Sequence, residues 1–258
     1  MPNIALERTE NVATIKIVRP EKHNALTGEM WKAVGTAFKT AGADESVRVV
    51  VLRGAGGRAF SVGADIGEFE QTRAGKPQAI AFAEVVHDCV RAIQDCPHPT
   101  IAAIEGLCVG GGVEIAAACD LRLASNSSRF GVPIQRLGLT VDYPELDSLK
   151  RLVGPSNALE ILYEGRIFGA DEALQKGLVN RIVADAVFAE ELAGVIGRIA
   201  SGAPLVARWH KRMVRRLEEQ RPVTPEERHA PLEVFDSEDY RLGTRAFLEK
   251  RAPVFVGR

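Results

Sequence analysis

Apolar side chains recur along this chain in short runs, and the period of each run predicts the element that it forms. Residues 4–7 and 12–18 alternate between apolar and polar, which predicts two strands joined in a hairpin at Glu10 and Asn11. Other runs are almost continuously apolar, as expected of parallel strands that are buried on both faces. These runs span residues 47–52, 100–104, 121–124 and, more briefly, 179–183.

The segments between these runs have the 3.6-residue period of helices. A helix at residues 28–41 follows Thr27, a residue type that caps helix N-termini. Residues 129–143 contain glycines and a proline and predict a loop. Strands that alternate with helices predict an α/β fold with a parallel core and a helical C-terminal segment. The other expected helices lie at residues 77–93, 113–119, 155–164 and 170–176, and from residue 185 onward.

Composition narrows the class of partner. The 258 residues are 46% hydrophobic and 26% charged, and their net charge is −1. A nearly neutral chain has no electrostatic reason to bind nucleic acid or an anionic membrane surface. No apolar run approaches the roughly 20 residues that span a bilayer, and the first residues show no basic segment followed by an apolar one. We therefore expect a cytoplasmic protein that binds neither nucleic acid nor membrane.

Cysteine and histidine positions predict no metal site. The four cysteines form no C-x-x-C pair, and the five histidines show no H-x-x-x-H spacing. The expected state of the cysteines is the free thiol. A basic cluster with helical spacing predicts a solvated helix face. It consists of Arg208, Lys211, Arg212, Arg215 and Arg216.

Three glycine-rich segments follow predicted strands, and the first of them fits a dinucleotide-binding turn. Residues 54–59 read Gly-Ala-Gly-Gly-Arg-Ala, which matches G-x-G-x-x-A. That motif requires a helix that begins within the glycines, so that its N–H groups face a pyrophosphate. Residues 60–65 have no helical period, and no acidic residue ends a second apolar strand about twenty residues later. The sequence therefore argues against a nicotinamide dinucleotide.

The other two segments, residues 59–66 and 104–114, predict an oxyanion hole. Their small residues allow a ligand oxygen to approach main-chain N–H groups closely. Residues 110–112 (Gly-Gly-Gly) also open a helix, whose N-terminus favours a developing negative charge. Two N–H groups that converge on one carbonyl oxygen stabilise such a charge. Glu114 lies one turn inside the helix and is either a proton donor to the bound molecule or a carboxylate that favours the helix dipole.

Four segments distributed over the chain form a combined pattern. Residues 19–26 read Arg-Pro-Glu-Lys-His-Asn-Ala-Leu, and residues 59–65 read Ala-Phe-Ser-Val-Gly-Ala-Asp. Residues 106–120 contain the glycine triplet, and residues 246–253 read Ala-Phe-Leu-Glu-Lys-Arg-Ala-Pro. Together they resemble the crotonase (enoyl-CoA hydratase/isomerase) superfamily over nearly the whole chain.

This resemblance implies an architecture. The core is expected to be a ββα spiral over residues 1–200, and residues 201–258 are expected to form a helical trimerisation region. Members of the superfamily form trimers that often stack into hexamers. The expected substrate is an acyl-CoA thioester of fatty acid metabolism, and no separate cofactor is needed because coenzyme A is part of the substrate.

The resemblance also implies catalytic roles. The N–H groups of Ala64 and Gly111 match the oxyanion hole, and Glu114 matches the first catalytic carboxylate of the hydratases. Those enzymes carry a second glutamate twenty residues later, where this chain has Ile134. Adding water requires one group that deprotonates water and another that protonates carbon, so this replacement argues against efficient hydration.

The coenzyme A site implied by the resemblance is shared between subunits. Phe247 and Lys250 match residues that approach the adenine and its phosphate from a neighbouring subunit. The other residues implied to bind coenzyme A are Lys22, Ala25, Ala64, Asp65, Ile66 and Gly67.

Residues just beyond Ile134 are candidates for the missing acid–base group. Asp142 lies where dienoyl-CoA isomerases have an aspartate, so Glu114 and Asp142 are predicted to form the catalytic pair. Glu145 is a less favoured candidate, and Tyr143 is another because decarboxylases of the superfamily place a tyrosine in this loop. Asp142 fits equally well as the cap of a helix that begins near Tyr143.

The predicted function is an acyl-CoA enzyme that stabilises a thioester enolate and then moves a proton between Cα and Cγ or adds water, with isomerisation exceeding hydration. Two alternatives stay open. One is a non-catalytic acyl-CoA-binding protein, which Ile134 favours and Glu114 disfavours, and the other is a decarboxylase of the same superfamily. A serine peptidase is set aside because no serine with a suitable histidine partner lies near Gly111.

Overall fold

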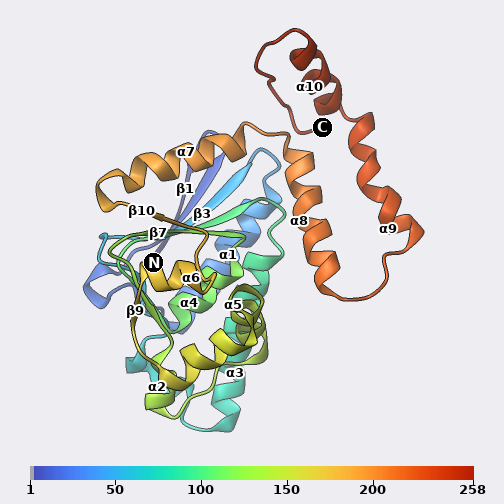
Figure 1. Cartoon of the computed structure of the whole chain (residues 1–258). Coiled ribbons are helices and arrows are strands. Elements are labelled where there is room, and N and C mark those ends of the chain that lie inside the picture. The colour runs from blue at the N-terminus through green and yellow to red at the C-terminus, as the bar shows by residue number, and fades with distance from the viewer. Residues whose placement is uncertain (1–2) are drawn as a thin grey trace.

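Two β-sheets form the centre of the molecule in the computed structural model, which describes residues 3–258 (Figure 1). The larger sheet contains β1 (Ile4–Thr9), β2 (Val12–Ile17), β3 (Val49–Gly54), β5 (Thr100–Ile104), β7 (Leu121–Ser125) and β10 (Arg181–Val183). The smaller sheet contains β4 (Ala59–Ser61), β6 (Leu107–Val109), β8 (Arg129–Gly131) and β9 (Phe168–Gly169). Their strand orders are β1-β2-β3-β5-β7-β10 and β4-β6-β8-β9. Met1 and Pro2, with which the expected core begins, lie outside the described residues.

Most strands of both sheets are parallel. In the larger sheet only the hairpin of β1 with β2 is antiparallel, and in the smaller sheet only the pair of β8 with β9. Parallel neighbours need crossover connections, and here these connections are mainly helices. The predicted α/β fold with a parallel core is therefore confirmed.

Side chains of the larger sheet enter two separate cores, which explains why its strands read as continuous apolar runs. Val50 and Leu52 of β3 face one core, which also contains residues of several helices. Val49 and Val51 face the other core, which is covered by α7 (Phe188–Ala200). Successive residues of a strand point to opposite faces, so both must be apolar when both faces are buried. The helices on the first face include α1 (Gly28–Ala43), α3 (Lys76–Gln94), α4 (Gly111–Ala118), α5 (Tyr143–Glu164) and α6 (Ala170–Gln175).

The segment expected to be a loop contains more regular structure than predicted. Residues 129–143 begin with β8 and continue into a 3₁₀ helix, Pro133–Leu137. Directly afterwards, α5 runs to Glu164 with one break at Gly154, whose φ of +75° favours glycine. The strands of the smaller sheet are two or three residues long, which is too short to show a period in the sequence.

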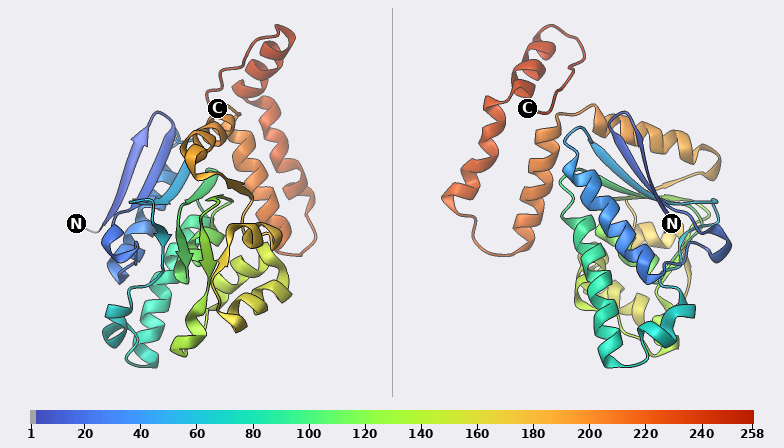
Figure 2. Two further views of the ribbon diagram at one scale, coloured as in Figure 1. Left: turned by 60° about the vertical axis from the view of Figure 1, so that its left-hand side comes forward. Right: turned by 180° about the vertical axis from the view of Figure 1, so that it is seen from behind.

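The last part of the chain forms a helical arm that projects from the core (Figures 1 and 2). After α8 (Pro204–Glu218), the chain turns back through α9 (Pro225–His229) and a 3₁₀ segment into α10 (Glu238–Leu248). The residues after α10 then return towards the start of the arm. Arg48 of the core donates hydrogen bonds to the carbonyl oxygens of Phe255 and Ala200, the latter at 2.9 Å. The arm is therefore attached to the core at both of its ends.

The basic cluster on α8 is not a solvated face, and that prediction is wrong. Lys211 Nζ lies 2.7 Å from Asp120 Oδ2 and also donates to the carbonyl oxygen of His98, so its side chain is only 9% exposed. Arg215 contacts the same Asp120, at 3.3 Å. Arg216 pairs with Glu227 at 2.6 Å. The sequence pattern showed the cations but not their partners, of which Asp120 and His98 lie far away in the chain.

Across residues 3–258, no helix combines the length and apolar character needed to cross a membrane.

Candidate functional site

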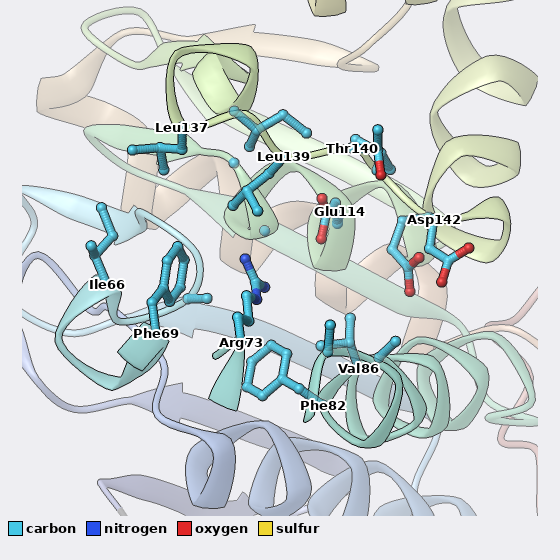
Figure 3. Close-up of a pocket in the computed structure, with 18 of the residues that line it drawn as sticks. Ile66, Phe69, Arg73, Phe82, Val86, Glu114, Leu137, Leu139, Thr140 and Asp142 are labelled. Atoms are coloured by element: carbon cyan, nitrogen blue, oxygen red, sulfur yellow. The ribbon is translucent and has the colours of Figure 1, made fainter. Parts of the chain in front are cut away.

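A cavity of about 720 Å³ opens between the start of α4, the face of α3 and the segment that leads into α5 (Figure 3). Its floor includes the two glycine-rich segments that the sequence singled out. Its walls come from α2 (Phe69–Thr72), the start of α5 and the residues after β8. The cavity therefore contains residues that are up to 120 positions apart, from Ala25 to Glu145.

The two glycine-rich segments touch through their backbones. A Cβ atom at Gly63, where φ is +83°, would lie 2.5 Å from the nitrogen of Gly111. A Cβ atom at Gly112 would lie 2.2 Å from the carbonyl oxygen of Ser61. Pairing of β4 with β6 brings these segments together, and no larger residue fits between them.

The N–H groups of Ala64 and Gly111 are available to a ligand. The residues on either side of Ala64 are both hydrogen-bonded to Leu26. The N–H of Leu26 donates to the carbonyl oxygen of Gly63 at 2.8 Å, and the N–H of Asp65 donates to the carbonyl oxygen of Leu26 at 2.9 Å. Gly111 is the first residue of α4, where an N–H has no partner within the helix. Within residues 3–258, neither of these two N–H groups donates a hydrogen bond, and both residues line the cavity. Two such N–H groups on one cavity wall are available to a ligand oxygen.

Glu114 lines the cavity from the first turn of α4. Burial, with a smaller effect from the nearby Glu145, raises the pKa of its carboxyl group to about 8 although Arg73 opposes the shift. A carboxyl group with this pKa keeps its proton at neutral pH and is suited to act as an acid.

Glu145 brings a second carboxyl group into the same cavity. It lies in the first turn of α5 and is only 2% exposed, and its Oε1 atom has no hydrogen-bond partner in the described part of the chain. Its Oε2 atom lies 3.8 Å from His87 Nε2. Burial raises the pKa of Glu145, Asp142 adds to this and His87 opposes it. Two buried carboxyl groups that interact in this way favour a state in which only one is ionised.

Asp142 caps α5 at the rim of the cavity. Its Oδ1 atom accepts a hydrogen bond of 2.8 Å from the N–H of Tyr143, and its Oδ2 atom lies 3.1 Å from His87 Nε2. The capping role that the sequence allowed for Asp142 is thus confirmed. Tyr143 is 84% exposed and does not line the cavity.

Arg73 is a cavity residue that sequence reasoning missed. Its guanidinium group lies 4.2 Å from the ring centroid of Phe69 and 4.8 Å from that of Phe82, and it points towards Glu114 (Figure 3). Burial lowers the pKa of Arg73, which shows that the charge is poorly hydrated. His87, on α3, was missed as well. The apolar face of α3, with Phe82 and Val86 towards the cavity, was the one available signal for it.

Some residues expected to bind coenzyme A lie in the cavity and others do not. Ala25, Asp65 and Ile66 line it, and Asp65 forms an ion pair of 2.7 Å with Arg19. Gly67 is not a lining residue, but its N–H donates to the Asp65 side chain at 2.9 Å. Lys22 is exposed and also lies outside the lining.

Phe247 and Lys250 lie on the arm, away from the cavity. Phe247, near the end of α10, is 83% exposed. In Figure 1, α10 is at the opposite end of the molecule from α2 and α3, which form the cavity wall. These two residues therefore do not contact the cavity of their own chain.

The described residues contain no group of three or more histidine, cysteine, aspartate or glutamate side chains that could hold a metal ion. All four cysteines are buried free thiols.

Known proteins resemble this chain over almost its whole length. The family model described as enoyl-CoA hydratase/isomerase matches residues 7–258. The crotonyl-CoA hydratase of Syntrophomonas wolfei is 33% identical over 99% of this chain and 98% of its own, and the short-chain-enoyl-CoA hydratase of Clostridium acetobutylicum is 34% identical over 96% and 95%. A crystal structure of an enoyl-CoA hydratase/carnithine racemase from Magnetospirillum magneticum superposes with a TM-score of 0.98 at 47% identity, covering 100% of this chain and 97% of that one.

Proposed function

Because the chain belongs to the enoyl-CoA hydratase/isomerase family and has its crotonase fold, we propose that it stabilises the enolate of an acyl-CoA thioester and transfers protons to and from that enolate. One observation carries this proposal. The carboxyl groups of Glu114 and Glu145 lie in the same cavity as two N–H groups that donate no hydrogen bond within residues 3–258.

The N–H groups of Ala64 and Gly111 hold the thioester oxygen in this proposal. Removing a proton from Cα places negative charge on that oxygen, and two hydrogen-bond donors fixed in advance stabilise the charge. Gly111 contributes additionally as the first residue of α4, since a helix N-terminus favours an anion.

Glu145 acts as the base and Glu114 as the acid. Glu145 disfavours the ionised form of Glu114, and His87 favours the ionised form of Glu145. Glu145 therefore ionises first while Glu114 keeps its proton. This assignment replaces the Glu114–Asp142 pair that the sequence predicts, because Asp142 is occupied as the cap of α5 and as a partner of His87.

The proposed reaction is the isomerisation of a 3-enoyl-CoA to a 2-enoyl-CoA. Glu145 removes a proton from Cα, the electron pair moves into the thioester oxygen, and Glu114 gives its proton to Cγ. Water has no place in this step, which agrees with the apolar Ile134 on the cavity wall. Hydration is the second candidate, because Glu145 supplies a carboxylate that could instead deprotonate a water molecule adding to Cβ.

The test compares 3-hexenoyl-CoA isomerisation with 2-hexenoyl-CoA hydration in the purified protein. We expect isomerisation to have the higher kcat/KM. Glu114→Gln and Glu145→Gln should each lower its kcat by about 10²–10⁴, the usual contribution of one acid–base group. Glu84→Gln, on the exposed side of α3, is the control. Faster hydration would favour the second candidate, and binding of both thioesters without turnover would mean that the protein is a non-catalytic binder.

A further inference from the structure

Arg73 places an unpaired positive charge in the cavity. Of the lining residues among positions 3–258, it alone is an arginine or lysine. In the same part of the chain its guanidinium group has no ion pair and no hydrogen bond, and its neighbours are the rings of Phe69 and Phe82. Aromatic faces attract a cation but do not use its N–H donors. The five donors of Arg73 are therefore open to a ligand.

Two other enclosed arginines of this protein, Arg122 and Arg19, have partners for their donors. Arg122 is buried and donates to the carbonyl oxygens of Leu178 at 2.9 Å and Cys119 at 2.6 Å. Arg19, which is mostly buried, pairs with Asp65 at 2.7 Å. Arg73, which lines the cavity, has no such partner among residues 3–258.

Glu114 is the acidic side chain towards which Arg73 points, yet it does not neutralise the arginine (Figure 3). The pKa of Glu114 is about 8 even with Arg73 beside it, so Glu114 is mostly protonated at neutral pH. Asp142 lies further along the cavity, where it interacts with His87 (Figure 3). An anionic ligand group is the partner that the arginine lacks.

We propose that Arg73 binds a carboxylate carried by the acyl group, so that the preferred substrate is the coenzyme A thioester of a dicarboxylic acid. The planar guanidinium group accepts a carboxylate through two parallel hydrogen bonds. The rings of Phe69 and Phe82 lie against the group and exclude water, which strengthens the interaction. This inference rests on the proposed function for the location of the acyl group, between Arg73 and Glu114.

Binding of saturated thioesters tests the inference without requiring turnover. Glutaryl-CoA carries a terminal carboxylate, and 5-methylhexanoyl-CoA has the same shape with an isopropyl group in its place. Calorimetry on the full-length protein measures both dissociation constants. We expect glutaryl-CoA to bind about tenfold more tightly than 5-methylhexanoyl-CoA, and we expect Arg73→Gln to bind the two thioesters equally well. Arg91→Gln, an exposed arginine of α3 that pairs with Asp88, should leave the ratio unchanged.

Three results would overturn the inference. The wild type could show no preference for glutaryl-CoA. Arg73→Gln could weaken both thioesters equally, which would place a phosphate of coenzyme A at Arg73. Arg73→Gln could also keep the preference, and a circular dichroism spectrum equal to that of the wild type would show that the variant is folded. Failure of the proposed function would be seen differently. The protein would then turn over no enoyl-CoA, while the ratio of the two dissociation constants could still be as expected.

Discussion

Glu114 combines an acidic side chain with a setting that opposes its ionisation. Its pKa rises from 4.5 to about 8, chiefly through burial. Between these values the unfolded chain releases the proton and the folded chain keeps it. The contribution of Glu114 to the free energy of unfolding should therefore be fully present below about pH 4.5 and be lost as the pH rises towards 8.

Glu114→Gln should remove most of this dependence on pH. A neutral amide fills the same space in both states, so the free energy of unfolding should change less between pH 5 and pH 8.5 than in the wild type. The difference is expected to be on the order of a few kcal/mol. Urea unfolding at fixed protein concentration measures it. Parallel curves for the two proteins would mean that Glu114 ionises normally in the folded state.

Residues of the site differ in how far the sequence could reveal them. Ala64, Gly111 and Glu114 stand inside contiguous motifs, so the sequence indicated all three as candidates, and all three line the cavity. Glu145 was only a less favoured candidate, and Arg73 and His87 were not found at all. Their roles depend on which segments meet across the cavity, and a linear pattern does not contain that information.

At the next level, the start of α5 shows how one residue can serve a helix and border a site. Asp142 accepts from the N–H of Tyr143 and thereby caps α5, and that same helix carries Glu145. Asp142→Ala should cost about 1 kcal/mol of stability, whereas Asp142→Asn, which also caps well, should cost much less. Thermal unfolding measures both.

Activity separates capping from chemistry at the same position. If Asp142 only caps, Asp142→Asn should retain most of the wild-type kcat for 3-hexenoyl-CoA. A loss as large as that of Glu145→Gln would contradict the assignment of Glu145 as the base and return Asp142 to the catalytic pair.

Elements were predictable where their length allowed a period to appear. Helices α1 and α3 and the buried strands of the larger sheet were found within a few residues of their ends, whereas α5, expected at residues 155–164, begins at Tyr143. The smaller sheet was missed because its strands have two or three residues each. The basic cluster of α8 was misinterpreted because Asp120, which neutralises Lys211 and Arg215, comes from a distant turn.

For the molecule as a whole, the arm is notable because it leaves large apolar side chains exposed to solvent. Leu232, Phe235, Phe247 and Leu248 are large apolar residues on it, and each is more than half exposed. We propose that the arm packs against neighbouring subunits in a trimer or hexamer, with residues 201–258 as the oligomerisation region. Apolar patches of this kind normally lie in interfaces.

Lys250→Ala tests whether the arm also completes a neighbour's nucleotide site. We expect coenzyme A to bind about tenfold more weakly, because a contact with its 3′-phosphate is lost, and dephospho-CoA to be less affected. Lys150→Ala, on the surface of α5, is the control. Light scattering gives the oligomeric state, and a fully active monomer would refute both the assembly and the shared site.

Because the arm is attached to the core at both ends, less conformational entropy would be lost when subunits associate. Arg48 donates to the carbonyl oxygens of Ala200, just before the arm, and of Phe255, near the end of the arm, and Asp239 of α10 accepts from the N–H groups of Val256 and Gly257. A strand of chain that is free at one end loses much conformational entropy when a partner orders it, whereas a closed loop has lost most of that freedom already. In the proposed trimer, the arm would therefore meet its partner as a preorganised surface, and most of the free energy of contact would remain for affinity.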